Sequence, residues 1–436
     1  MYSIFVILII GVLIVACLIK EKNWSNPITV FTIMWEFICI LAGLRLYDMY
    51  EYDERVFFLI LLGVLGVFLG YFAASRVRIR KKYTIPFIGI RQDTNYVYNN
   101  IVIIGSLVIA AIIYLLMSLQ VIGLLLQGFN TATIREMYRE TGSTTVSGMA
   151  LGAIYGSNIL KELELYIAQP VMRACVPIFA LEIVYKRKIS KISILSVVVI
   201  LLYTLSKFGR FGLMYLITDI IICYCVIGSR MDAKTKRKIK RVVYAGLVVF
   251  AAVLVYLSLA RWENNILRTI YAYFAIPAPL FEHWVEEVDS VGAYSYGISF
   301  IQGLMEFIVR VTKKFGIVPN AYNVANLYNY NLVDGWVHIA PELIQNAYVS
   351  MFFSFYLDFR EIGIVVESFI FGWITSKSYK RAQDKKPIYV AFYLLLFQCL
   401  VKSFVRWDFV LSQYWLSFLF LRLWFKKDNN KKIIIT

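Results

Sequence analysis

Histidine and cysteine are scarce in this chain of 436 residues, and neither forms the pattern of a metal site or a disulfide framework. The two histidines, His283 and His338, stand far apart, and no His-x-x-x-His or Asp-x-Asp grouping occurs. All six cysteines lie in or beside apolar runs, away from the long polar segments, which argues against disulfides. We therefore expect neither a metal ion nor another cofactor.

Charged residues are also few, at 17% of the chain, whereas hydrophobic residues make up 60%. Runs such as Tyr2–Ile19, Val56–Ala74 and Val242–Leu259 carry no charge and have the ~20-residue length that a bilayer requires. In lipid such runs must be helical, because no water is present to bind the backbone amides and carbonyls. The sequence therefore predicts an all-α, polytopic integral membrane protein.

We expect about eleven transmembrane helices, with the N-terminus outside and the C-terminus inside. Their expected ranges are 2–19, 28–46, 55–75, 100–120, 168–185, 192–206, 211–229, 242–259, 361–376, 388–404 and 408–425. The first run has no basic leading region and no cleavage site, so we interpret it as a retained helix. Residues 121–127 are open to two interpretations, a longer fourth helix or a re-entrant piece.

The formal net charge of +17 would suit a nucleic-acid partner, but its distribution does not. The basic residues gather in short loops between apolar runs, for example 76–82 and 230–241. This pattern orients those loops toward the cytoplasm by the positive-inside rule and brings them to anionic lipid head groups. We expect membrane lipids, and no nucleic acid, as partners.

Residues 260–345 form the longest polar segment, and there acidic residues outnumber basic ones by eight to five. An acidic excess in a basic chain is typical of a translocated loop. Within it, residues 296–311 are apolar enough for an interfacial helix. We divide the chain into membrane helices 1–259 with an outer segment at 128–167, a large extracytoplasmic loop at 260–345, and C-terminal membrane helices at 346–436.

Several arginines fall on the predicted outer side, against the orientation rule: Arg210, Arg261, Arg268 and Arg406. Guanidinium groups bind diphosphate with paired hydrogen bonds and stay charged when desolvated, so the group predicts an anion site. For a single arginine, snorkelling to lipid phosphates is the other interpretation. Ionisable residues inside the spans, such as Asp219 and Lys402, are expected to pair within the bundle.

Aromatic and amide side chains alternate in residues 320–330. Tyr322, Tyr328, Tyr330 and Trp336 could stack on sugar rings, with neighbouring asparagines bonding to sugar hydroxyls. The alternative is the aromatic belt that collects at membrane interfaces. His338 is a candidate general base, because histidine titrates near neutral pH, or else a plain hydrogen-bonding residue.

Four segments together resemble the Wzy-type oligosaccharide repeat-unit polymerases of bacterial O-antigen and capsule assembly. They are Asn26-Pro-Ile-Thr opening the second span, Gly209-Arg210 at a hairpin, Arg268–Phe281 after the eighth span, and Asn346–Phe359 with Gly363. The last is similar to an Asn…Tyr-x-Asp-Phe-Gly-x-x-Gly pattern, with Arg360 in place of its first glycine. The order of spans and loops resembles that family over nearly the whole chain, whereas the motifs cover a small part of the chain.

The resemblance implies a glycosyltransferase that joins undecaprenyl-diphosphate-linked oligosaccharides at the outer face of the bacterial cytoplasmic (inner) membrane. A sugar hydroxyl of one unit would attack the anomeric carbon of the growing chain, and undecaprenyl diphosphate would leave. The four outer arginines would bind the diphosphate, and His338, Glu342 or Asp358 would accept the proton. Asp358 could instead cap a helix or pair with Arg360. A chain-length regulator and a flippase are the implied protein partners.

Three other functions remain open at this point. A lipid-linked oligosaccharide flippase or other secondary transporter predicts charges along several helix centres and short loops on both sides. An O-antigen ligase predicts the same layout with a lipopolysaccharide-core acceptor. A membrane scaffold leaves the outer arginines unexplained.

Overall fold

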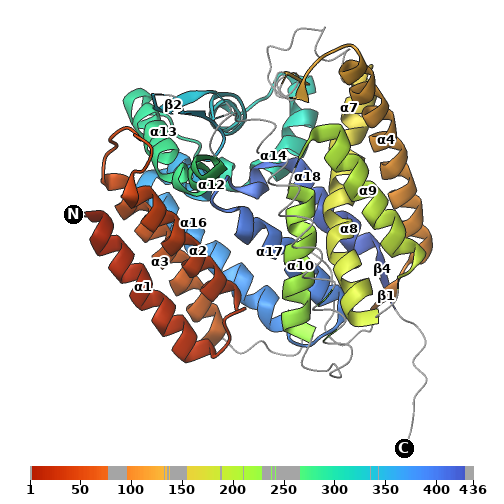
Figure 1. Cartoon of the computed structure of the whole chain (residues 1–436), viewed down its shortest axis with the longest axis horizontal. Helices are drawn as coiled ribbons and strands as arrows, with labels where there is room; N and C mark the ends of the chain where they lie inside the picture. The colour runs from red at the N-terminus through yellow and green to blue at the C-terminus, as the bar shows by residue number, and fades with distance from the viewer. Residues whose placement is uncertain are drawn as a thin grey trace, which may run out of the picture.

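The computed structural model describes residues 2–76, 96–131, 155–186, 189–209, 211–227, 266–333, 335–341 and 343–427, with isolated positions 133, 134, 137, 237 and 241. These residues are mainly helical, and their strands form two short antiparallel pairs (Figure 1). Five helices of this part of the chain are long and apolar enough to cross a membrane. The predicted class, an all-α multi-pass membrane protein, is confirmed.

The first four expected spans correspond to α1 (Tyr2–Glu21), α2 (Pro27–Leu44), α3 (Arg55–Arg76) and α4 (Asn100–Leu126). Because α4 continues to Leu126, residues 121–126 lengthen this helix and Gln127 caps its end. The fifth is one continuous helical stretch of α7 (Asn158–Leu163), η1 (Glu164–Ala168), α8 (Gln169–Leu181) and η2 (Glu182–Lys186).

The later helices also fall near the expected ranges. They are α9 (Lys191–Lys207), α10 (Phe211–Ile227), α16 (Ser350–Ala382), α17 (Pro387–Lys402) and α18 (Ser412–Leu423). The eighth expected span, 242–259, lies outside the described residues, so the count of eleven stays a prediction. Strand β1 (Tyr96–Tyr98) pairs with β4 (Phe425–Lys427) and ties the end of α18 to the start of α4.

Glycines bring α3 and α16 into close contact along their length. A Cβ atom at Gly70 would collide with the carbonyl oxygen of Phe369, and one at Gly372 would collide with that of Val67. Small residues allow such backbone approach, which is how helices pack where lipid supplies no hydrophobic drive. Among the described elements, α3 and α16 pack against each other most extensively.

Helix α1, in contrast, is little covered by the rest of the protein. Its mean hydropathy is 3.1, yet only 17% of its apolar window is buried by the rest of the protein. Phe5, Leu8 and Val12 are among its exposed side chains. An apolar face of this size is expected against lipid chains rather than water.

The Asn26-Pro27 motif starts α2 for a local physical reason. The Asn26 side chain accepts a hydrogen bond of 3.0 Å from the Ile28 amide and caps the helix, while Pro27 occupies a first-turn position that needs no amide proton. Asn26 is fully buried, and its amide nitrogen donates to Tyr71 at 2.8 Å. The motif therefore also joins α2 to α3.

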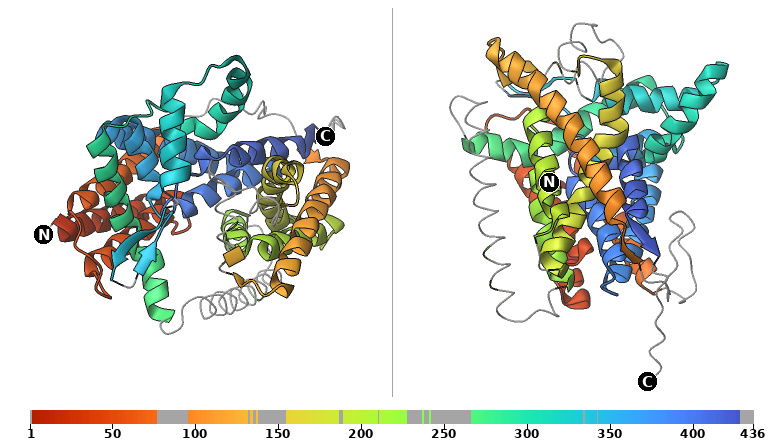
Figure 2. Two further views of the ribbon diagram at one scale, coloured as in Figure 1. Left: turned by 90° about the horizontal axis from the view of Figure 1, so that it is seen from above. Right: turned by 90° about the vertical axis from the view of Figure 1, so that its right-hand side faces the viewer.

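The polar segment folds mainly into helices at one end of the bundle (Figures 1 and 2). It contains α12 (Ile266–Ala275), α13 (Pro277–Val291), α14 (Ile298–Thr312), η4 (Lys313–Phe315), α15 (Asn320–Asn326), η5 (Leu327–Leu332) and the hairpin of β2 (Val337–Ala340) with β3 (Leu343–Gln345). Helix α14 matches the helix expected at 296–311. Its interfacial placement and the domain boundaries remain predictions.

Helix α16 breaks sharply at Arg360, whose φ of 55° and ψ of −138° belong to a region that glycine favours. This is the position where the resembled pattern has glycine. Arg360 is held there by its Nε, which lies 3.1 Å from Asp289 Oδ1, and by the stacking of its guanidinium 4.1 Å from the ring centre of Tyr294. Beyond the break, a Cβ at Gly363 would collide with the carbonyl oxygen of Phe355, so this position requires glycine.

Replacing Arg360 separates the backbone strain from the side-chain contacts. Both Arg360→Gly and Arg360→Ala lose the ion pair with Asp289, but only alanine keeps a Cβ in the strained conformation. We expect Arg360→Ala to be less stable than Arg360→Gly by about 1 kcal/mol, seen as a lower unfolding temperature in detergent. Equal stability of the two variants would show that the break carries no strain.

Candidate functional site

Two cations and one carboxylate meet inside the protein where α8, α17 and the loop 403–411 come together. Lys402 Nζ donates to Asp408 Oδ1 at 2.5 Å, and the Arg173 guanidinium lies 3.4 Å from the same oxygen. The side chains of Arg173 and Lys402 are 10% and 8% exposed, and that of Asp408 is fully buried. We call Arg173, Lys402 and Asp408 the charged cluster.

Local structure explains how each member reaches this place. Arg173 lies on α8, near the middle of the continuous helical stretch Asn158–Lys186, while Lys402 is the last residue of α17. Asp408 begins the short 3-10 helix η6 (Asp408–Val410) after the turn that ends α17. The charged cluster therefore forms where the end of α17 and the loop after it pack against the middle of the fifth helical stretch.

The polar segment holds the loop 403–411 on both sides of Asp408. Trp407 Nε1 donates to the Phe300 carbonyl at 2.8 Å, and its indole stacks on the Phe300 ring at 5.2 Å between centroids. Tyr330 donates its hydroxyl to the Val410 carbonyl at 2.6 Å. The charged cluster thus lies at the end of the bundle that carries the polar segment.

The charged cluster has more positive than negative charge and unused hydrogen-bonding capacity. Two cations face a single carboxylate, and Asp408 Oδ2 has no donor among the described residues. The buried hydroxyls of Ser403, Ser412 and Tyr215 likewise lack a partner in this part of the chain. The excess of buried positive charge, together with hydroxyl groups that can donate, suits a bound anion with several oxygen atoms; Asp408 Oδ2 is itself an acceptor and does not contribute to this.

A further cation, Lys207, ends α9 at the hairpin between α9 and α10. Its Nζ donates to the Tyr155 hydroxyl at 2.9 Å and lies 3.4 Å from Glu164 Oε2. After the hairpin, the Phe211 ring centre lies 5.5 Å from Lys402 Nζ. The hairpin that the sequence singled out therefore borders the charged cluster.

Two of the four predicted diphosphate-binding arginines, Arg210 and Arg261, lie outside the described residues. Arg406 stands two residues before Asp408 on the same loop, is partly buried, and pairs through its backbone with Ser350. Arg268 lies partly buried on α12. The structure thus brings Arg406 onto the loop of the charged cluster and places Arg268 on a separate helix.

The three candidate bases occupy different environments. His338 is exposed on β2, and Glu342 lies outside the described residues. Asp358 is fully buried and accepts hydrogen bonds from the Ser299 and Phe300 amides at 3.0 and 2.8 Å, with a further one from the Ser295 hydroxyl. These contacts cap the start of α14 and match the structural alternative expected for Asp358.

The predicted sugar-binding aromatics also separate into two kinds. Tyr328 is 3% exposed and belongs to the core, and Tyr330 braces the loop 403–411. Tyr322 is partly buried and Trp336 is 53% exposed. Tyr322 and Trp336 therefore keep surface on which a sugar ring could stack, whereas the interior positions of the other two favour packing.

Sequence reasoning missed Arg173 and Asp408. Arg173 is the only charged residue between Glu164 and Glu182, inside an apolar run, and that isolation was the available signal. Asp408 follows Trp407 at an expected span end and resembles an ordinary helix-flanking carboxylate. Their pairing becomes visible only when α8 and α17 are packed together.

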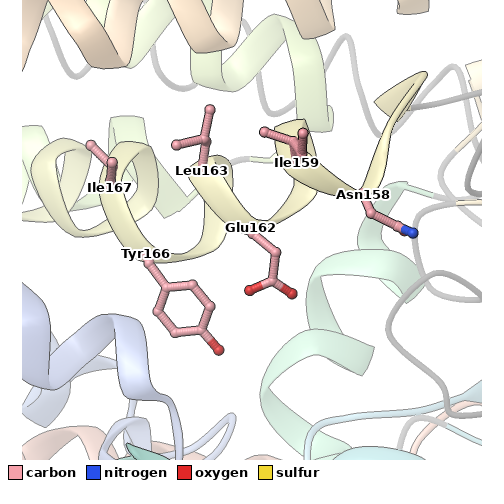
Figure 3. Close-up of a pocket in the computed structure, with 6 residues that line it drawn as sticks. All are labelled: Asn158, Ile159, Glu162, Leu163, Tyr166 and Ile167. Carbon is pink, nitrogen blue, oxygen red and sulfur yellow. The ribbon is translucent and has the colours of Figure 1, made fainter.

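A surface cavity of about 400 Å³ lies beside α7 and η1. It is lined by Asn158, Ile159, Glu162, Leu163, Tyr166 and Ile167. Glu162 and Tyr166 extend from the same side of this helix (Figure 3) and reach α14, where Glu162 pairs with Arg310 at 3.1 Å and Tyr166 donates to Glu306 at 2.5 Å. These polar contacts join α14 to the fifth helical stretch.

Glu282 on α13 is a buried carboxyl group in the polar segment. It accepts a 2.9 Å hydrogen bond from the Asp53 amide. Burial, and secondarily the neighbouring Glu286, raise the pKa of Glu282 to about 7. This carboxyl group is a further candidate for proton transfer near neutral pH that the sequence alone did not distinguish.

Comparison with family models, curated proteins and solved structures gives no match to this chain.

Glu282 should make stability depend on pH. Because folding raises its pKa from 4.5 to about 7, the native state holds the proton more tightly, and stability should fall as pH rises through this interval. We expect Glu282→Gln to remove that slope and to gain on the order of 2 kcal/mol at pH 8, measured as unfolding temperature. Glu287→Gln, an exposed change on α13, is the control and should keep the slope. A wild-type curve that is flat over this interval would contradict the assignment.

Proposed function

We propose that this protein is a glycosyltransferase that polymerises undecaprenyl-diphosphate-linked oligosaccharide repeat units into O-antigen or capsular polysaccharide. Its site would face outward from the bacterial cytoplasmic membrane. The observation that supports this most is the charged cluster, a buried excess of positive charge beside a polar, aromatic segment. The resemblance of the sequence motifs to the Wzy-type polymerases supplies the reaction.

Diphosphate is the anion that fits this chemistry best. It has several oxygens for the guanidinium and ammonium donors, and it gains charge as the bond to the anomeric carbon breaks. Arg173 and Lys402 are largely removed from water, where an electrostatic contact to the leaving group is stronger than at an exposed surface. Arg406 is the predicted arginine nearest in the chain to the charged cluster.

The reaction joins an acceptor hydroxyl oxygen to the anomeric carbon and breaks the bond from that carbon to diphosphate. The hydroxyl proton passes to a base, and undecaprenyl diphosphate leaves with the bonding electrons. His338, Glu342 and Glu282 are the candidate bases in the polar segment, and cationic side chains would neutralise the leaving group. Asp358 is better explained as the cap of α14.

The cationic site and the carboxylates of the bundle bear on the two alternative functions. An O-antigen ligase would use the same donor and the same cationic site, so only the acceptor distinguishes it. A secondary transporter would use carboxylates within the bundle, such as Asp219. That carboxylate accepts a 2.8 Å hydrogen bond from Gln398, a local pairing that favours a structural role.

Removing a cation from the site should stop chain growth. We expect Arg173→Gln and Arg406→Ala to reduce long-chain polysaccharide by roughly 100-fold, because each contact to a developing charge contributes this order of rate. The control is Arg310→Ala, an exposed arginine of α14 that should leave the chain ladder normal. Gel analysis of surface polysaccharide, with membrane protein levels matched by immunoblot, measures the effect.

The same gels distinguish the functions. Single repeat units at the cell surface without long chains indicate a polymerase. Loss of all surface units indicates a flippase, and lipid-linked long chains that are never transferred indicate a ligase. Normal ladders in both variants would contradict the proposed diphosphate site.

Replacing the exposed histidine tests the base. We expect His338→Ala to lose activity at every pH if the imidazole accepts the acceptor proton, because no other group would then stand in its place. Polymerisation measured across pH in membranes gives the result. Retained turnover would assign the base to Glu342 or Glu282.

A further inference from the structure

We propose that Asp408 is a built-in counter-ion of the charged cluster, which the diphosphate of the substrate displaces. Without substrate, the carboxylate would neutralise part of the charge on Arg173 and Lys402. With substrate, the two cations would turn to the phosphate oxygens. This inference rests on the proposed function and concerns the regulation of the same site.

The way Asp408 is held differs from the way a structural carboxylate is held in the same protein. Asp358 accepts hydrogen bonds on both oxygens, two of them from backbone amides. Asp408 meets both cations through Oδ1 alone, and Oδ2 has no donor among the described residues. The contacts of the Asp408 side chain among the described residues are with two cationic side chains and not with a helix amide, so this carboxylate can leave them without uncapping a helix.

The charge balance also favours replacement of Asp408 by the diphosphate as the partner of the two cations. One carboxylate cannot fully neutralise two cations. Buried cations remain poorly compensated in this state, so a dianionic group that reaches both of them gains more than Asp408 provides. Without substrate, Asp408 lowers the free-energy cost of burying the two cations. It neutralises them less completely than the diphosphate would.

The surroundings allow the carboxylate to turn without moving the loop. Trp407 and Val410 are fixed to the polar segment by hydrogen bonds of 2.8 and 2.6 Å, so the backbone on either side of Asp408 is held. Ser403, the residue after Lys402, is buried, and its hydroxyl has no partner among the described residues. Return of Asp408 to the cations would in turn favour release of the diphosphate product.

The test is binding of inorganic pyrophosphate to the purified full-length protein in lipid nanodiscs, measured by calorimetry. If Asp408 competes with the anion, Asp408→Asn should bind pyrophosphate at least ~10-fold more tightly than the wild type. The matched control is Glu306→Gln, a carboxylate outside the charged cluster, which should bind like the wild type. Wild-type binding with unchanged or weaker binding by Asp408→Asn would overturn the counter-ion while leaving the diphosphate site in place.

A second variant covers the case in which Asp408→Asn does not fold, because it leaves two buried cations unpaired. Lys402→Met combined with Asp408→Asn keeps the net charge of the wild-type cluster and removes both the competitor and one ligand. The comparison is with Lys402→Met alone, which loses the same ligand and keeps Asp408. Tighter pyrophosphate binding by the double variant supports displacement, and equal or weaker binding overturns it. If neither the wild type nor any variant binds pyrophosphate, the diphosphate site of the proposed function fails together with the inference.

Discussion

The attraction between Asp408 and two buried cations is the interaction on which this end of the protein depends. Arg173, Lys402 and Asp408 come from separate helices and a loop, and each would be costly to bury alone. Together they fix where α8, α17 and η6 meet. One positive charge is nevertheless left without a carboxylate, and Asp408 Oδ2 has no hydrogen-bond donor among the described residues. A purely structural ion pair would be closer to balance, so the same imbalance that costs stability provides a place for an anion.

The polar segment and the membrane helices are joined by buried hydrogen bonds rather than by a flexible tether. Asp358 of α16 caps α14, and α14 in turn accepts the indole proton of Trp407 through Phe300. Tyr330 then fixes Val410, just beyond Asp408. Residues predicted from the sequence to bind sugar therefore serve partly to hold the loop of the proposed anion site. A substrate bound to the polar segment would be placed in fixed relation to the cations.

The break in α16 shows how one departure from a sequence pattern is accommodated. Arg360 occupies a conformation suited to glycine, and its guanidinium contacts Asp289 on α13 and Tyr294 in the loop that follows it. The side chain thus offsets the strain of its own backbone while attaching α13 to α16. Gly363 keeps its glycine because the Phe355 carbonyl lies against it. Contacts of the Arg360 side chain thus support a backbone conformation that glycine adopts more readily.

Composition and local pattern alone determined the membrane class, the positions of most helices, the capped start of α2 and the helix near 296–311. These features follow from hydropathy and from contacts between residues close in the chain, which a sequence displays directly. The tertiary structure decided the partners: Arg173 with Asp408, Asp358 with the start of α14, and Tyr330 with Val410. Those pairings join residues far apart in the chain. A lone charge or tyrosine has the same appearance in a sequence whether it faces lipid, substrate or a distant helix, and only helix packing selects among them.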